Sequence, residues 1–283
     1  HHYWDADNHL DFGSSKDQGS RITGAGDINL YAAHDLQAKA AQVQAGGNLS
    51  VGAGHDITIS EGRSSTYLDE AHKVKVRELF GSVTGSTADK VQSSEAIANQ
   101  FTGRTVQMNA GNDINAVATQ IKAQEGGSVT AGNNIHLDAA ANTRSESHSR
   151  QESSSSFFVI ASKKTNSSEQ STLDVTTHTG SVASTVSGNI VVTGNRNGAA
   201  ASQTDKGVVT LTGSKVLSEQ GVAVVTGNHV ALDAVTDSTQ TGQSSRRSST
   251  SFSPWQLAAK RTNTADSSTQ TSTLQGSSVQ GGK

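Results

Sequence analysis

The sequence predicts an all-β protein, a parallel β-helix with about 21 residues in each rung. Two observations predict it: short glycine-cornered segments return 21 residues apart, and the residues after each corner alternate between apolar and polar. The composition agrees, because 32% hydrophobic and 4% aromatic residues leave little material for a wide globular core. Small polar residues with a single proline, Pro254, suit ladders of backbone hydrogen bonds instead.

The repeat is seen in two separate parts of the chain. "GDINL" (26–30) returns as "GNLSV" (47–51), and "GNDINAVA" (111–118) returns as "GNNIHLDA" (132–139). A fixed period of this length is typical of a solenoid, in which each repeat packs only against its neighbours.

Each repeat begins at a glycine corner. Asparagine follows several of these glycines, and asparagine tolerates a left-handed backbone. We expect the glycines to adopt positive φ angles, at which a Cβ atom would clash. The predicted structural corners are Gly26, Gly47, Gly54, Gly111, Gly132 and Gly227.

Apolar residues after the corners alternate, as in Ile57 and Ile59, which places each pair on one face of a strand. Three such short strands fill one repeat and cannot bury their inner faces alone. Stacking each strand on its equivalent in the next repeat pairs the backbone at a spacing of about 4.8 Å. An antiparallel β-sandwich is the alternative, but it does not explain the return of the corners. The predicted core residues are Ile57, Ile114, Ile135 and Val230.

Three Ser/Thr-rich tracts interrupt the repeats. They lie near 63–90, 142–172 and 236–269, and the last two follow segments that match at a shift of 95 residues. Each tract has two polar arms around a short apolar centre, which favours an extended hairpin or flap over a disordered insertion. The expected organisation is an irregular lead-in over 1–20 and one β-helical domain over 21–283.

The apolar centres of the tracts are the predicted contact sites for a membrane or a partner. Basic residues such as Lys163 and Lys164 follow them, and the first tract has Leu79 and Phe80 near its centre. The alternative is that the centres fold back and pack on the rungs. The predicted contact residues are Phe157, Phe158, Val159, Ile160, Phe252, Trp255 and Leu257.

Several classes of protein are excluded by what the chain lacks. It has no cysteine, so disulfide scaffolds and thiolate metal sites are excluded. It has no apolar run long enough for a transmembrane helix and no signal peptide. A net charge of -3 gives no electrostatic footprint for nucleic acid. Because the chain begins with two histidines and no methionine, we expect it to be a fragment of a larger protein.

The sequence contains no recognisable motif for catalysis or for a cofactor. Neither a nucleophile elbow, a Walker loop, a zincin motif nor the calcium-binding nonapeptide is found. His34 and His55 are expected to stack at one corner as solvated neighbours, because no third metal ligand follows their register. Asp138 and Asp233 occupy equivalent positions but not adjacent rungs, so they form no sugar-cleaving pair. We expect no enzymatic activity, no metal and no cofactor.

Three of the corner segments resemble the repeats of filamentous haemagglutinin: "AGGNLSV" (45–51), "AGHDITI" (53–59) and "AGNNIHL" (131–137). The Ser-rich tract that follows the last of them resembles the haemagglutinin repeat of the related contact-dependent growth-inhibition exoproteins. The resemblance covers most of the chain from about Arg21 onward. It implies a right-handed parallel β-helix and a role in adhesion or toxin delivery.

Members of this family are secreted surface filaments of Gram-negative bacteria. The resemblance implies a secreted or cell-surface location and export of the full-length protein through an outer-membrane transporter. It also implies that this segment engages the target-cell outer membrane during transfer of a C-terminal toxin. The family's "NPNL" secretion motif and "VENN" pre-toxin motif are absent from the sequence, so we expect neither secretion recognition nor toxicity from it. The alternative function is an adhesin shaft that binds a surface receptor or glycan.

Overall fold

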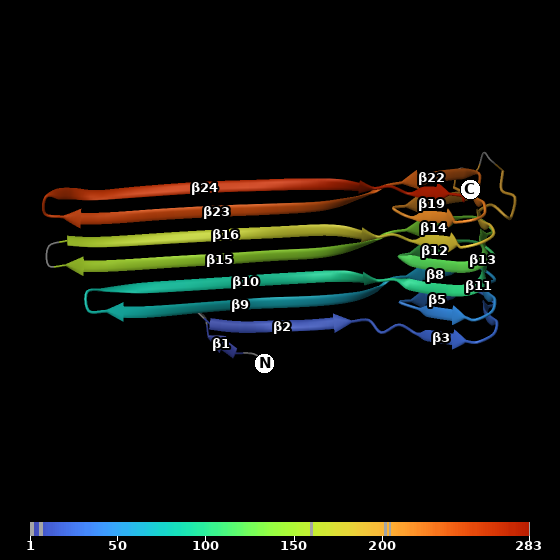
Figure 1. Cartoon of the computed structure of the whole chain (residues 1–283), viewed down its shortest axis with the longest axis horizontal. Coiled ribbons are helices and arrows are strands. Elements are labelled where there is room, and N and C mark those ends of the chain that lie inside the picture. Colours follow the sequence, from blue (N-terminus) through green and yellow to red (C-terminus); the bar gives the residue numbers. More distant parts are fainter. Residues whose placement is uncertain (1–2, 6–7, 159–160, 201–202, 204, 283) are drawn as a thin grey trace.

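The computed structural model describes residues 3–5, 8–158, 161–200, 203 and 205–282. Every secondary-structure element in this described part is a β-strand, and the strands form two regions (Figure 1). Short strands stack into rungs in one region, and long hairpins extend from one side of the rungs in the other. No membrane-crossing helix is found among the described residues.

Each rung contains three short strands, and equivalent strands of successive rungs pair in parallel. The first face contains β3 (Arg21–Gly24), β6 (Gln42–Ala45), the first part of β11 (Asn99–Ala110), the first part of β13 (Thr119–Ala131), β17 (Val182–Thr185), β20 (Lys215–Ser218) and β25 (Ser278–Gln280). The second contains β4 (Ile28–Ala32), β7 (Leu49–Ala53), the later parts of β11 and β13, β18 (Ile190–Thr193) and β21 (Ala223–Thr226). The third contains β5 (Leu36–Lys39), β8 (Ile57–Ser60), β12 (Ile114–Val117), β14 (Ile135–Asp138), β19 (Val208–Thr212) and β22 (His229–Asp233).

The 21-residue period is the register of this parallel pairing. Leu36 pairs with Ile57, and Ile114 pairs with Ile135. The side chains of Ile57, Ile114 and Ile135 are fully buried, as predicted. They form one column because the register places them directly above one another on the inner face.

Val230 departs from the predicted core, although it continues the same column. It pairs with Val209 and is 46% exposed. Its strand β22 is the last of the third face, so no described strand covers its outer side.

The glycine corners do not adopt the positive φ angles that we expected. In the described part, left-handed glycines occur elsewhere, for example at Gly188 and Gly213. The corner glycines are instead required by close stacking. A Cβ at Gly111 would lie 2.0 Å from the carbonyl oxygen of Gly54, and one at Gly132 would lie 1.9 Å from that of Gly111. The backbone of one rung therefore fills the space that a side chain of the next rung would need.

Close stacking also accounts for three of the other predicted corners. Gly54 and Gly227 face carbonyl oxygens of the adjacent rung, and Gly47 faces the carboxylate of Asp27. Gly26 is the exception, because a Cβ built there has nothing within 4 Å.

A buried polar ladder lies at the corner where the hairpins leave and re-enter the rungs. Asn99 Oδ1 accepts the Ala41 N–H at 2.8 Å, and Ser181 Oγ accepts the Thr119 N–H at 3.0 Å. Ser214 Oγ in turn accepts the Ser181 N–H at 3.0 Å. Each side chain satisfies a buried donor of the neighbouring rung, so the chain can leave at this corner without stranding a polar group. The sequence analysis missed this ladder, whose signal is Ser, Thr or Asn at the first position of most strands of the first face or immediately before it.

The Ser/Thr-rich tracts form long antiparallel hairpins whose bounds are wider than those expected. The hairpins are β9 (Gly62–Glu78) with β10 (Gly81–Ile97), β15 (Ala140–Phe158) with β16 (Ala161–Thr179), and β23 (Val235–Ser253) with β24 (Gln256–Gln275). The 19 residues of β15 place the tip about 60 Å from the rungs.

The hairpins lie edge to edge in one antiparallel sheet, since β10 pairs with β15 and β16 pairs with β23 (Figure 1). A hairpin leaves after β8, after β14 and after β22, which is after every second rung. Two rungs advance by two strand spacings, and a hairpin also supplies two strands at the same spacing of about 4.8 Å. Successive hairpins therefore meet without a gap.

The lead-in over 1–20 is not irregular, contrary to expectation. It contains β1 (Tyr3–Asp5) and β2 (Asn8–Lys16), and β2 pairs antiparallel with β9. The edge of the first hairpin supplies unpaired backbone groups that this segment satisfies, which the local sequence does not reveal.

Candidate functional site

The described ends of the three hairpins gather at the end of the sheet that lies farthest from the rungs (Figure 1). Leu79 and Phe80 form the first turn, and Pro254 and Trp255 form the third. In the second hairpin, Phe158 pairs with Ala161 across the turn. Proline is tolerated in such a turn because it need not donate to a ladder.

Exposed apolar side chains cluster at this edge. Leu79 is 91% exposed and Trp255 is 92% exposed, although both are large. The rings of Phe80 and Phe158 lie with centroids 5.6 Å apart, and the Phe157 N–H donates to the Phe80 carbonyl at 2.8 Å. Leu79, Phe80, Phe157, Phe158 and Phe252 line one hollow, and Trp255 lies in the turn that follows Phe252. We call these six exposed side chains the tip cluster.

The structure places four of the predicted contact residues in the tip cluster. Phe157, Phe158, Phe252 and Trp255 are exposed, and they lie at the far end of β15, at the far end of β23 and in the third turn. Val159 and Ile160 lie outside the described residues. Leu257 is in β24, but its side chain is outside the description.

Leu79 and Phe80 were not among the predicted contact residues. The first hairpin ends two pairs of residues earlier than the second, so its turn lies beside Phe157 and Phe158. Their signal in the sequence was the central position in the first Ser/Thr-rich tract.

The histidine corner on the rungs is stacked as predicted, but a carboxylate joins it. The rings of His34 and His55 lie 4.8 Å apart. Asp35, which lies one position after the histidine register, is 2.9 Å from His34 Nδ1 and 3.2 Å from His55 Nδ1. Asp35 also accepts the Asp56 N–H, and this bond, followed by the one from His34, lowers the pKa of Asp35. These hydrogen bonds account for the arrangement as a corner ladder, and we assign it no metal.

A His–Asp pair joins neighbouring segments at each junction of the hairpin sheet. His9 meets Asp69 at 3.1 Å between β2 and β9, and His178 meets Asp237 at 2.8 Å between β16 and β23. At the junction of β10 and β15, His148 Nδ1 lies 2.9 Å from Asp89 Oδ1. The hydrogen bond that His148 donates to Asp89 is the main reason that the pKa of His148 is raised, with Glu146 adding to it.

We expect the pairing of the first two hairpins to weaken as pH rises. Because the folded-state pKa of His148 exceeds its unfolded value of about 6.5, its contribution is fully present below that value and is lost as pH rises through the folded pKa. The effect should stay below about 1 kcal/mol, since the pair is half exposed. Amide hydrogen exchange in β10 and β15 at about pH 5.5 and about pH 8.5, corrected for intrinsic rates, measures it. If His148→Gln shows the same pH dependence as the wild type, the assignment to His148 is wrong.

Comparison with known proteins supports the resemblance seen in the sequence. The hemagglutinin repeat family matches residues 10–77 and 80–165, which together are more than half of the chain. One relative is the "16S rRNA endonuclease CdiA" of Enterobacter cloacae subsp. cloacae, which is 24% identical over 130 residues. That alignment covers 46% of this chain and 4% of the relative, so the chain spans a small part of the relative's length. No solved structure matches the chain.

The matched residues include β2, the first hairpin, four rungs and the tip of the second hairpin. Rungs and hairpins thus recur together as one sequence unit. The chain belongs to the hemagglutinin repeat family, a region of filamentous haemagglutinin and contact-dependent growth-inhibition exoproteins.

Proposed function

We propose that the chain is a non-catalytic structural and interaction segment of a secreted bacterial surface filament. In this proposal the rungs are a right-handed parallel β-helix that forms part of the filament shaft, and the hairpin sheet is its contact arm. The observation that carries the proposal is the tip cluster. A chain with only 4% aromatic residues exposes several of them together, about 60 Å from its core.

The tip cluster suits the surface of a target-cell outer membrane. Phenylalanine and leucine gain free energy when they leave water, and tryptophan is enriched at membrane interfaces. Lys163 and Lys164 follow the second tip, and Lys260 and Arg261 follow the third. Basic side chains therefore lie next to the tip cluster on the side toward the rungs. This arrangement supports a function in target-membrane engagement during toxin delivery, with the full-length protein exported through an outer-membrane transporter.

The experiment compares binding to outer-membrane vesicles. We expect Phe158→Ser with Trp255→Ser to weaken co-sedimentation with the vesicles at least tenfold. Fully burying one such side chain contributes roughly 1.5–3 kcal/mol, and about 1.4 kcal/mol corresponds to tenfold in affinity. The matched control is Tyr31→Ser with Phe12→Ser, which removes two exposed aromatic rings far from the tips. This control should bind as the wild type does.

Equal loss in the two double variants would show that general hydrophobicity, not the tip, drives binding. Wild-type protein that binds no vesicle would favour the adhesin function, in which a protein receptor or glycan is bound instead. Circular dichroism of each variant checks that the β-structure is retained.

A further inference from the structure

The two faces of the hairpin sheet carry very different charge near the tips. In an antiparallel sheet, residues directly opposite one another share a face, as do residues two positions apart along a strand. The printed registers therefore sort the side chains into rows that cross the sheet from β9 to β24.

Three successive rows on one face contain basic residues and no acidic residue within the described sheet. The row nearest the tips is Arg77, Ser82, Ser155, Lys164, Thr250 and Lys260. The next is Lys75, Thr84, Ser153, Asn166, Ser248 and Thr262, and the third is Lys73, Ser86, Gln151, Ser168, Arg246 and Thr264. We call these three rows the basic face.

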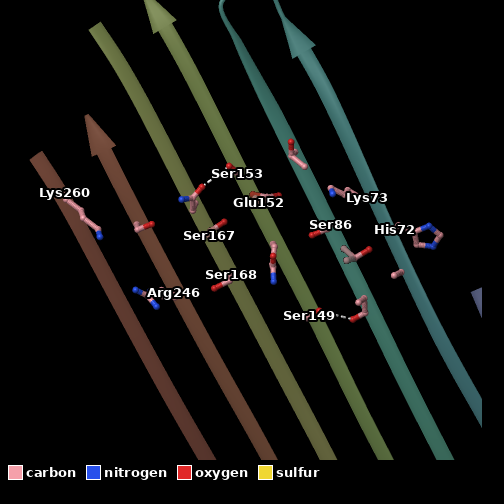
Figure 2. Close-up of a pocket in the computed structure, with 17 residues that line it drawn as sticks. His72, Lys73, Ser86, Ser149, Glu152, Ser153, Ser167, Ser168, Arg246 and Lys260 are labelled. Atoms are coloured by element: carbon pink, nitrogen blue, oxygen red, sulfur yellow. Dashed lines mark hydrogen bonds between the residues drawn. The ribbon is translucent and has the colours of Figure 1, made fainter. Parts of the chain in front are cut away.

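Five cations of the basic face are directed to solvent. Lys75, Arg77, Lys164, Arg246 and Lys260 are exposed, and none of them has an ion-pair partner among the described residues. Figure 2 shows Lys73, Arg246 and Lys260 along an open hollow of about 610 Å³, together with the hydroxyls of Ser86, Ser149, Ser153 and Ser168. Glu152 also borders the hollow, but its carboxylate is paired with Arg150 at 2.5 Å.

The opposite face is nearly neutral over the same length. Its cations Lys163, Arg247 and Arg261 are offset by Glu78 and Glu152. It also carries the exposed valines Val74, Val76 and Val83. The difference arises in the first hairpin, where Lys73, Lys75 and Arg77 follow period two on one face. The adjacent basic pairs of the other two hairpins place one cation on each face.

We propose that the basic face binds the phosphorylated sugar headgroups of glycolipids in the target outer membrane. Its cations suit phosphate, and its dense serine, threonine and asparagine side chains suit sugar hydroxyls. The tip cluster adjoins the basic face, so a lipid surface could contact the apolar side chains and the cations at the same time. A nucleic acid is disfavoured, because the three rows contain no aromatic side chain on which bases could stack. This proposal rests on the proposed membrane function and names its ligand chemistry.

The test uses neutral phospholipid vesicles with and without lipid A, the phosphorylated disaccharide lipid. The variant Arg77→Gln, Lys164→Gln, Lys260→Gln should bind the lipid A vesicles about 100-fold more weakly than wild type, since each cation near an anionic surface contributes about fivefold. The matched variant Lys163→Gln, Arg247→Gln, Arg261→Gln removes the same charge from the opposite face and should lose less than about tenfold.

The outcomes separate this proposal from the function on which it rests. Basic-face variants that bind as the wild type does, or equal losses in both triple variants, would overturn it. The proposal would also be overturned if the wild type bound any of three controls as tightly as it binds lipid A vesicles. The controls are dephosphorylated lipid A, phosphatidylglycerol vesicles of matched charge and a single-stranded DNA oligonucleotide. If only the tip variant Phe158→Ser with Trp255→Ser loses binding, the membrane function stands and the basic-face proposal fails. If no variant loses binding, both fail.

Discussion

Ile135→Asp should unfold the central rungs and should be the most damaging single substitution that we predict. Ile135 is fully buried between Ile114 and Val209, which pair with it from the rungs on either side. Loss of isoleucine packing alone costs about 2–5 kcal/mol, and a buried carboxyl without a partner adds a desolvation penalty. Hydrogen exchange in β12, β14 and β19 should rise far more than exchange in β4 and β5, because solenoid rungs are coupled chiefly to their neighbours.

The control for this experiment lies in the same column of side chains. Val230→Asp introduces the same carboxyl on the same face, but Val230 is 46% exposed and the carboxylate reaches water. We expect it to cost much less. The Ile135→Asp defect should also shrink at acid pH, since protonation removes the buried charge. Equal destabilisation by the two substitutions would contradict a closed inner face at Ile135.

Gly111→Ala should destabilise the rungs by about 1–3 kcal/mol, although it adds one methyl group at an exposed corner. The new Cβ would lie 2.0 Å from the carbonyl oxygen of Gly54, and backbone cannot rotate away as a side chain can. The stacked corners would have to separate, which strains the hydrogen bond from the Gly111 N–H to the Ala53 carbonyl. Urea unfolding followed by circular dichroism measures the change in the free energy of unfolding.

Gly26→Ala is the matched variant, because it changes the same residue type in the same motif. A Cβ there meets nothing within 4 Å, and the backbone is not left-handed. Alanine should be neutral or stabilise by up to about 1 kcal/mol, since it restricts the unfolded chain. If the two variants were equally destabilised, left-handed geometry rather than close stacking would be the reason for glycine at these corners.

A local sequence pattern was sufficient to predict the inner faces of the rungs. Alternation in "ITI" (57–59) and "IHL" (135–137) indicated inward side chains, and the period indicated which strands are equivalent. Both are local properties, because a strand's two faces and its distance to the next copy are written in adjacent residues. The glycine corners were located for the same reason, but their cause was misjudged. The atom that excludes a Cβ at Gly111 belongs to Gly54, in another rung.

The arrangement of the candidate site could not be predicted from local patterns. The sequence located the apolar centres and the cations behind them, since each lies within one tract. It did not show that Phe80 meets Phe158, or that Lys260 shares a row with Arg77. Those relations depend on the tertiary structure.

The sequence by itself determined the repeat, the inner faces of the rungs and the positions of the polar tracts. Only the tertiary structure decided that separate hairpins form one sheet with a basic face and a common apolar edge. The physical reason is a coincidence of spacing: two rungs and one hairpin advance by the same distance, so hairpins separated by two rungs lie in register. That register is a property of the stacked chain and is absent from any single repeat.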